Sequence, residues 1–232
     1  IPNIIDGLKP SLRKIMFSCL KRNLKKEIKV SQLAGYVSEN SAYHHGEQSL
    51  YDSIIGLAQD YVGSNNIELL EPNGQFGTRL ENGKDSASPR YIFTNLSEIS
   101  FHIFNPLDNP LLEYNEDDGQ KIEPIWYIPV IPMILVNGTE GIGTGFSTKV
   151  PCHNPEEIIQ NLYNLMDDKQ VVQMKPWFRG FQGKIDFKKI NDFGVQQYVN
   201  NGCYKIIDDT TVLINELPIG RSTEDYKIFL ES

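Results

Sequence analysis

Three segments with the apolar spacing of amphipathic helices follow one another within the first 62 residues of the chain. They are expected at residues 11–20, 30–39 and 46–62, and Pro10 suits the first turn of the first one. Three short helices joined by small turns are typical of a helix-turn-helix arrangement. The apolar residues on the predicted buried faces are Leu12, Ile15, Met16 and Cys19, then Val30, Leu33, Ala34 and Val37, then Leu50, Ile54, Leu57, Ala58 and Tyr61.

Turn-forming residues dominate residues 69–94, which follow the third predicted helix. Within this stretch the pair Asn82-Gly83 is a strong signal for a β-hairpin. A hairpin that follows a helix-turn-helix is the wing of a winged-helix fold. The pattern therefore predicts a winged helix, followed by a short helix at residues 96–104.

The second half of the chain has a different pattern. Residues 125–147 are expected to contain a buried strand interrupted by prolines, followed by a glycine-rich loop at 137–145. Asn154 and Pro155 are typical of the cap and the first position of a helix, which is expected to end at Met166. Beyond Gly180 the pattern predicts strands at 183–187, 198–207 and 210–217. We therefore expect an α+β protein with a second, β-rich domain.

Charge is distributed unevenly along the chain, whose net charge is −8. Residues 1–50 hold eight Lys or Arg against four acidic residues, so this segment carries +4 and the remainder −12. Binding to nucleic acid needs only a local basic surface, so an acidic protein is not excluded from it. Lys9, Arg13 and Lys14 fall at the start or along the polar side of the first helix. A solvated helical face is the plainer reading of these charges.

The cysteines and the absence of long apolar runs set the broad class. Cys19, Cys152 and Cys203 are far apart and lack metal-ligand spacing, which favours a reduced, intracellular protein. The most apolar stretch, residues 126–136, is short and broken by two prolines, so no membrane-spanning segment is expected. The chain starts at Ile1 without a signal-peptide pattern, and we interpret it as a fragment of a longer protein.

The most informative motif is Ser86-Ala-Ser-Pro-Arg-Tyr91. A tyrosine phenol is a poor nucleophile at neutral pH because its ordinary pKa is about 10. A neighbouring arginine such as Arg90 favours the phenolate, and also the negative charge that builds on a phosphoryl group under attack. Attack of Tyr91 on a phosphodiester would give a phosphotyrosine ester, a covalent intermediate. Taken alone, an Arg-Tyr pair without a chemical role is the commoner case.

The pair His44-His45 lies just before the third predicted helix. Adjacent residues rarely point at one ion, and no nearby ligand spacing supports a metal site. Contact with a phosphate, or stabilisation of transition-state charge near the helix N-terminus, is the better functional reading. Two polar residues that merely cap the helix are an equally good interpretation.

The glycine-rich loop 137–145 lacks the Gly-Lys-Ser/Thr ending of a nucleotide-binding P-loop. Its unusual feature is an apolar residue, Ile142, between Gly141 and Gly143. Proteins that bend DNA from the minor groove use an apolar wedge of this kind to unstack a base step. Packing of Ile142 into the core is the alternative.

Together these segments resemble the breakage-reunion region of the eukaryotic-type members of the type IIA DNA topoisomerases. The motifs occur in the order and spacing of that family, and the resemblance is dense over residues 1–166 and thin beyond. The residues that carry it are 1–10 (IPNIIDGLKP), 41–47 (SAYHHGE), 76–79 (FGTR), 83–93 (GKDSASPRYIF), 127–132 (YIPVIP) and 137–145 (NGTEGIGTG).

The resemblance implies domains and residue roles. It implies a winged-helix domain at residues 1–105 and the start of a β-rich tower domain at 106–232, which includes the glycine-rich loop. The implied catalytic residues are Tyr91 as the nucleophile, Arg90 as the transition-state stabiliser and His45 as the residue that helps hold the scissile phosphate. The implied DNA-binding residues are Lys9, Arg13, Lys14, His44 and the intercalating Ile142.

The resemblance also implies what the rest of the protein does. The full-length enzyme is expected to be an ATP-dependent homodimer that cuts both strands of double-stranded DNA, passes a second duplex and religates. Mg²⁺ and ATP are expected on upstream metal-binding and ATPase domains outside this chain, and no metal site within it. The isolated chain is then expected to bind DNA without cleaving it. The expected compartment is nuclear for a cellular protein, and cytoplasmic or nuclear for one from a large DNA virus.

Two other functions fit parts of the sequence. A non-catalytic winged-helix DNA-binding module would use Arg90 and Tyr91 only to touch phosphate. A structural or dimerisation module would carry the basic residues incidentally, and it would show negligible affinity for DNA even at low salt.

Overall fold

Helices dominate the first part of the chain and antiparallel hairpins the rest, in a computed structural model that describes residues 1–192 and 194–232. Every sheet among these residues is a two-stranded antiparallel pair, in the order β1–β2, β3–β4, β5–β6, β7–β8 and β9–β10. This mixture of helices and small sheets confirms the α+β class. The elements are α1 (Pro10–Lys21), β1 (Ile28–Lys29), α2 (Val30–Ser41), α3 (Glu47–Ala58), η1 (Arg79–Glu81), β2 (Phe93–Thr94), α4 (Glu98–Ile103), η2 (Pro106–Leu111), β3 (Tyr114–Asp117), β4 (Gln120–Pro124), α5 (Met133–Val136), β5 (Thr139–Ile142), β6 (Ser147–Val150), α6 (Pro155–Met166), β7 (Lys184–Ile190), β8 (Gln196–Asn201), β9 (Cys203–Asp208), β10 (Thr211–Glu216) and α7 (Thr223–Glu231).

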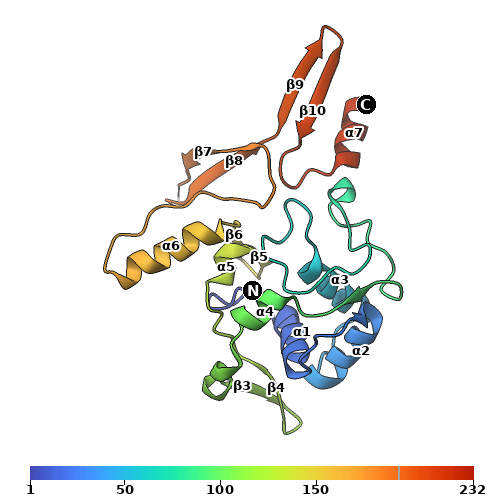
Figure 1. Ribbon diagram of the computed structural model, residues 1–232, viewed down its shortest axis with the longest axis vertical. Coiled ribbons are helices and arrows are strands. Elements are labelled where there is room, and N and C mark those ends of the chain that lie inside the picture. Colours follow the sequence, from blue (N-terminus) through green and yellow to red (C-terminus); the bar gives the residue numbers. More distant parts are fainter. Residues whose placement is uncertain (193) are drawn as a thin grey trace.

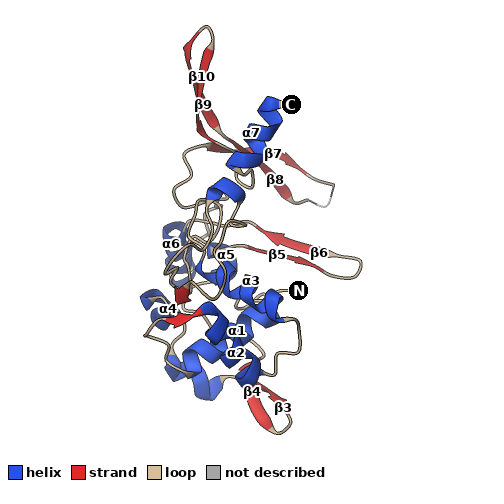
Figure 2. Cartoon of the chain, turned by 90° about the vertical axis from the view of Figure 1, so that its right-hand side faces the viewer, coloured by secondary structure: helices blue, strands red, loops and turns tan. Residues whose placement is uncertain are grey.

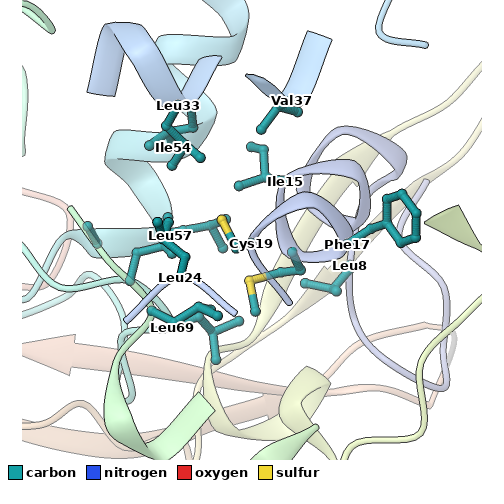
Figure 3. Packing of buried hydrophobic residues seen from close by; sticks show 14 of the residues in the cluster. Leu8, Ile15, Phe17, Cys19, Leu24, Leu33, Val37, Ile54, Leu57 and Leu69 are labelled. Atoms are coloured by element: carbon teal, nitrogen blue, oxygen red, sulfur yellow. The ribbon is translucent and has the colours of Figure 1, made fainter. Parts of the chain in front are cut away.

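The core lies where α1, α2 and α3 meet. Figure 3 shows Ile15 and Cys19 of α1 directed toward side chains of the other two helices, which include Leu33 and Ile54. The predicted apolar faces of α2 and α3 are buried as expected, and on α1 only Leu12 is half-buried. Tyr61 is half-buried and lies beyond the end of α3. Removing one of these large side chains would cost about 2–5 kcal/mol of stability.

Arg13 was predicted on the polar side of α1, and this was wrong. Its side chain is buried, and its Nε and Nη2 donate to the two carboxylate oxygens of Asp6 at 2.7 and 2.9 Å. Asp6 is fully buried and also accepts from the backbone N–H groups of Leu8 and Tyr127, both at 2.9 Å. A buried charge persists when it is paired and hydrogen-bonded. Asp6 therefore ties the N-terminal segment to α1, through Arg13, and to the segment that contains Tyr127.

The hairpin predicted at Asn82-Gly83 is absent from the described residues. Asn82 instead takes the left-handed conformation (φ 51°) and ends the short helix η1. The loop around it is tied to distant groups: Asn82 donates to the carbonyl of Gly220 at 3.0 Å, and Gln59 donates to the carbonyl of Gly83 at 3.1 Å. Asn82 was thus correctly predicted to lie in a turn, but tertiary contacts take the place of the predicted strand pairing.

The second half differs from prediction at several places. The proline-rich stretch before residue 133 forms no strand and leads into α5, since proline lacks the N–H that a ladder needs. The glycine-rich loop is a hairpin, with Ile142 of β5 opposite Ser147 of β6. The strand predicted over 198–207 is two strands divided at Gly202. The helix α6 occupies 155–166 as expected, with the Asn154 side chain accepting from the Glu156 N–H at 2.9 Å. The hairpin β3–β4 and the helix α7 were not predicted.

One buried side chain, Asn66, joins the two halves of the chain. Its amide N–H groups donate to the carbonyls of Val136, His153 and Trp177, at 2.9 to 3.2 Å. Its oxygen accepts from the backbone N–H of Arg179 at 2.8 Å. In Figure 1, α1–α3 lie on the lower right and the β9–β10 hairpin and α7 at the top. Figure 2 shows the hairpins β3–β4, β5–β6 and β7–β8 projecting to the same side.

Candidate functional site

Tyr91 is an exposed side chain on a fixed stretch of backbone. It is 72% exposed, whereas the next residue, Ile92, is buried. On either side of it, the carbonyls of Pro89 and Ile92 accept from the N–H groups of Ser31 and Val30, at 3.1 and 3.0 Å. These are the first N–H groups of α2, which have no partner within the helix. The start of α2 therefore holds the segment that presents the phenol to solvent.

Arg90 lies close to both Tyr91 and the first turns of α3. Its guanidinium carbon is 5.9 Å from the centre of the Tyr91 ring. On α3 the Tyr51 hydroxyl donates to Glu47, and this hydrogen bond, together with partial burial and the charge of Glu47, raises the pKa of Tyr51. The positive charge of Arg90 acts in the opposite direction on that pKa. Arg90 is therefore a cation near both the exposed phenol of Tyr91 and the start of α3.

The two histidines lie in residues 42–46, which we call the histidine loop. It connects α2 to α3 and starts at Ala42, which has a left-handed conformation (φ 49°). Tyr43 is buried, and the edge of its ring meets the His45 ring at a centroid distance of 5.4 Å. His44 and His45 are exposed, just before the N-terminus of α3, where free backbone N–H groups favour anions.

An open groove brings four of the predicted residues together. Its volume is about 630 Å³, and Lys9, Lys14, His44 and His45 line it. Lys14 also has partners inside the protein, because its Nζ donates to the carbonyl of Ser41 and to Glu123. Arg13, in contrast, points into the core and does not line the groove. Tyr91 and Arg90 do not line it either, so the groove is one part of the candidate site.

Ile142 is the last residue of β5 in a projecting hairpin, and its side chain is 84% exposed. The alternative that Ile142 packs into the core is therefore wrong. Gly143 N–H donates to the carbonyl of Phe146 at 2.8 Å and closes the tip. At Gly141 a Cβ atom would lie 2.6 Å from Cδ of Pro2, so only glycine fits without a shift. The glycines on either side of Ile142 thus lie against Ile1 and Pro2 of the N-terminal segment, while the Ile142 side chain itself stays exposed on the projecting hairpin (Figure 2).

Three contributors to this region were missed from sequence. Asp117 lines the groove from the β3–β4 hairpin, and Glu123 of the same hairpin pairs with Lys14. Glu47 and Tyr51 interact one helical turn apart. The last pair has a local signal, since residues at i and i+4 share a helix face. The first two depend on contacts across about 100 residues of chain, which spacing does not reveal.

The described residues contain no group of three or more His, Cys, Asp or Glu side chains placed to hold a metal ion. Cys19 and Cys152 are buried, and burial raises the pKa of their thiols to about 12 and about 11. Thiols held in this protonated form are poor metal ligands and nucleophiles. No helix among the described residues is long and apolar enough to cross a membrane.

Comparison with known proteins gives consistent likenesses. The whole chain, residues 1–232, matches the family model that describes the A subunit of DNA gyrase/topoisomerase IV. It is 57% identical over 232 residues to the DNA topoisomerase 2 of Arabidopsis thaliana, covering 100% of this chain and 16% of that protein. It is 53% identical over 230 residues to the DNA topoisomerase 2 of Saccharomyces cerevisiae, covering 99% of this chain and 16% of that protein.

A solved structure matches over the full length of the chain. It is the Plasmodium falciparum topoisomerase II DNA-binding, cleavage and re-ligation domain, with 52% identity and a TM-score of 0.95. The match covers 100% of this chain and 31% of that one. The chain therefore spans only 14–16% of the length of the curated relatives that it matches.

Proposed function

The chain belongs to the type IIA DNA topoisomerases, the family that includes the A subunits of DNA gyrase and topoisomerase IV, and we propose that it is the DNA-binding and DNA-cleaving part of such an enzyme. The single observation that carries the proposal is an exposed Tyr91, next to Arg90, on backbone held by the start of α2. In the full-length protein this part would act on double-stranded DNA as one half of a homodimer.

We further propose the finer fold assignment. Residues 1–105 would be a winged-helix domain, with α1–α3 as its helical part and an irregular loop in place of a regular hairpin wing. Residues 106–232 would begin a tower domain that includes the β5–β6 hairpin. The packing of α1–α3 about one core and the succession of hairpins after residue 183 support this division.

The proposed reaction is a reversible transesterification. The Tyr91 oxygen attacks the scissile phosphorus and forms a new O–P bond, while the bond to the 3′ oxygen of the neighbouring nucleotide breaks. The proton lost by the phenol is balanced by one taken up at the leaving oxygen, and the products are a 5′-phosphotyrosyl ester and a 3′ hydroxyl. Religation is the reverse step. Religation needs no nucleotide hydrolysis, because the phosphotyrosyl ester retains the energy of the phosphodiester bond that was cut.

The residues around Tyr91 would each have a separate role. The Arg90 cation would stabilise the charge that grows on the phosphoryl oxygens. His45, with His44 beside it and Lys9 on the groove, would hold the scissile phosphate and its neighbours. Ile142 would enter a base step and bend the duplex. Arg13 is better assigned to the core than to the DNA, since Asp6 and Leu8 occupy its Nε and Nη2.

Magnesium and ATP would act through other domains of the full-length enzyme. The described side chains offer no donor set suited to Mg²⁺, so the steps above use only groups of this chain and of the DNA. We propose that the isolated chain binds DNA weakly and leaves a supercoiled plasmid uncut in the presence of Mg²⁺. We also propose that the full-length protein works in the nucleus of a cell, or in the nucleus or cytoplasm if a large DNA virus encodes it.

The substitution Tyr91→Phe tests the function in the full-length enzyme. It removes the attacking oxygen and keeps the ring, so we expect the covalent protein–DNA adduct to disappear while DNA affinity stays within about twofold. Tyr204→Phe is the matched control, because Tyr204 is also exposed but lies on β9. Denatured samples with labelled DNA would report the adduct on a gel.

The outcomes separate two functions. An undiminished adduct in Tyr91→Phe would contradict Tyr91 as the nucleophile. Binding without any adduct in the unchanged enzyme would favour a non-catalytic winged-helix DNA-binding protein, in which Arg90 and Tyr91 only touch phosphate.

A further inference from the structure

A shielded ion pair includes Lys14, which lines the groove. Lys14 Nζ of α1 is 2.8 Å from Oε2 of Glu123 on β4, and the two side chains are only 15% and 7% exposed. The partners are 109 positions apart in sequence, so the pair forms only when the β3–β4 hairpin packs on α1. A carboxylate this well shielded needs a compensating charge.

The same ammonium group reaches the end of α2. Lys14 Nζ donates to the carbonyl of Ser41, the last residue of the helix. The last carbonyls of a helix have no partner within it and carry partial negative charge, so a cation there is favourable. Glu123 pairs with the same cation. The three groups form a clamp, which we call the Lys14 clamp: Glu123, Lys14 and the Ser41 carbonyl.

The clamp stands immediately before the histidine loop. Ala42 follows Ser41 and takes a left-handed conformation (φ 49°), which a residue with a Cβ keeps only where its surroundings hold it. The next residue, Tyr43, is buried, and its ring edge touches His45. A change in the last turn of α2 would therefore move the backbone that leads into His44 and His45.

We propose that Glu123 is a positioning residue for the proposed DNA site: acting through Lys14 and the Ser41 carbonyl, it holds the histidine loop in the arrangement that receives a phosphate. The inference rests on the proposed DNA-binding function and deepens it. It also changes the role of Lys14, whose ammonium has three donors, two of which serve Ser41 and Glu123. Lys14 thereby supports the loop as well as lining the groove.

Hydrogen exchange of the 232-residue chain without DNA tests the positioning directly. Glu123→Gln keeps the shape of the side chain and removes its charge, so the amides of residues 42–46 are expected to exchange at least about fivefold faster. Amides in the middle of α3, such as those of Ile54 and Ile55, are expected to keep their rates. Glu116→Gln is the matched control, because it removes the same charge from an exposed position on the adjoining strand β3.

Coupling between Glu123 and His45 tests the consequence for DNA. With a short duplex and fluorescence anisotropy, Glu123→Gln and His45→Ala are each expected to weaken binding about fivefold relative to Glu116→Gln, and the double variant no more than either alone. If Glu123 only stabilises a part of the fold unrelated to His45, the fold-losses of affinity of the two single variants are expected to multiply in the double variant. Glu123→Asp, which keeps the charge, is expected to restore most of the affinity.

Each result is decisive. Unchanged exchange in the histidine loop, acceleration spread over the whole chain, or multiplied losses of affinity would each overturn the proposal. If Glu123→Gln does not fold, Glu123→Asp takes its place in both measurements; because its shorter side chain restores most but not all of the contact with Lys14, it is expected to show the same local pattern at smaller size. If the unchanged chain binds no DNA, the proposed function fails, while the exchange measurement still decides the positioning.

Discussion

At the residue scale, Asp6 shows how a charged side chain can belong to the core. It accepts hydrogen bonds from Arg13 and from the backbone of Leu8 and Tyr127, and it has no exposure to solvent. These contacts fix the N-terminal segment, the start of α1 and the segment near residue 127 relative to one another. Its role is therefore structural, although the surrounding sequence is rich in basic residues.

The substitution Asp6→Asn is expected to lower the free energy of unfolding by about 3–5 kcal/mol, because it leaves the Arg13 charge buried without a counter-charge. Urea titration followed by circular dichroism measures the change. Asp167→Asn breaks the exposed pair with Lys169 and is expected to cost at most about 1 kcal/mol. A loss below about 1 kcal/mol for Asp6→Asn would show that the buried pair is not needed for stability.

Ile142 gives the opposite case, an apolar residue that the fold does not need. Because its side chain is 84% exposed, Ile142→Ala is expected to change the free energy of unfolding by less than about 0.5 kcal/mol. The bend of a bound duplex, measured by fluorescence transfer between its ends, is expected to decrease. Ile206→Ala, at an exposed position of β9, is expected to leave the bend unchanged. An equal bend in both variants would contradict a wedge at Ile142.

At the scale of elements, the β5–β6 hairpin depends on a close approach between Gly141 and the N-terminal segment. A methyl group on Gly141 would meet the Pro2 ring at 2.6 Å, whereas one on Gly35, in the exposed part of α2, would meet nothing within 4 Å. The same glycine-to-alanine change therefore has opposite consequences at the two positions. One position is limited by tertiary packing and the other by helix propensity.

Gly141→Ala is expected to destabilise the protein by about 1–3 kcal/mol, because the hairpin and the N-terminal segment must move apart. Gly35→Ala is expected to stabilise it by about 1 kcal/mol, since alanine favours the helix and open space surrounds it. Thermal denaturation of the two variants would show shifts of opposite sign. A Gly141→Ala variant as stable as the unchanged protein would mean that the Pro2 ring can move aside without loss of stability.

Helices and caps were the elements that sequence predicted well. The buried face of α2 and both ends of α6 follow from local spacing and from Asn154 and Pro155. The predicted hairpin at Asn82-Gly83 was wrong, because the asparagine side chain binds Gly220 and the turn serves a tertiary contact. Local patterns report conformational preference, but pairing of strands depends on which partner is within reach.

At the scale of the whole molecule, Asn66 connects segments that are 70 to 113 positions away in sequence. Every polar group of its side chain has a partner: three carbonyls and one backbone N–H. Nothing in the sequence around residue 66 distinguishes this asparagine from its neighbour Asn65. Its position decides how the groove end of the molecule is joined to α6 and the later strands.

Asn66→Ala is expected to lower the free energy of unfolding by about 3 kcal/mol, because it leaves several buried backbone groups without partners. Limited proteolysis is expected to cut first between residues 137 and 180. Asn73→Ala, at an exposed position, is expected to cost less than about 0.5 kcal/mol. Equal stability of the two variants would show that Asn66 does not join the halves.

Sequence by itself determined the helical start of the chain, the cap of α6 and the identity of the residues with chemistry, because spacing and side-chain type are local properties. The family resemblance added roles for Tyr91, Arg90, His45 and Ile142. Only the tertiary structure decided that Arg13 is buried, that Lys14 is clamped by Glu123, and that the Ile142 side chain is exposed on a hairpin. Burial and pairing of a charge depend on groups brought from distant parts of the chain, and no local pattern contains them.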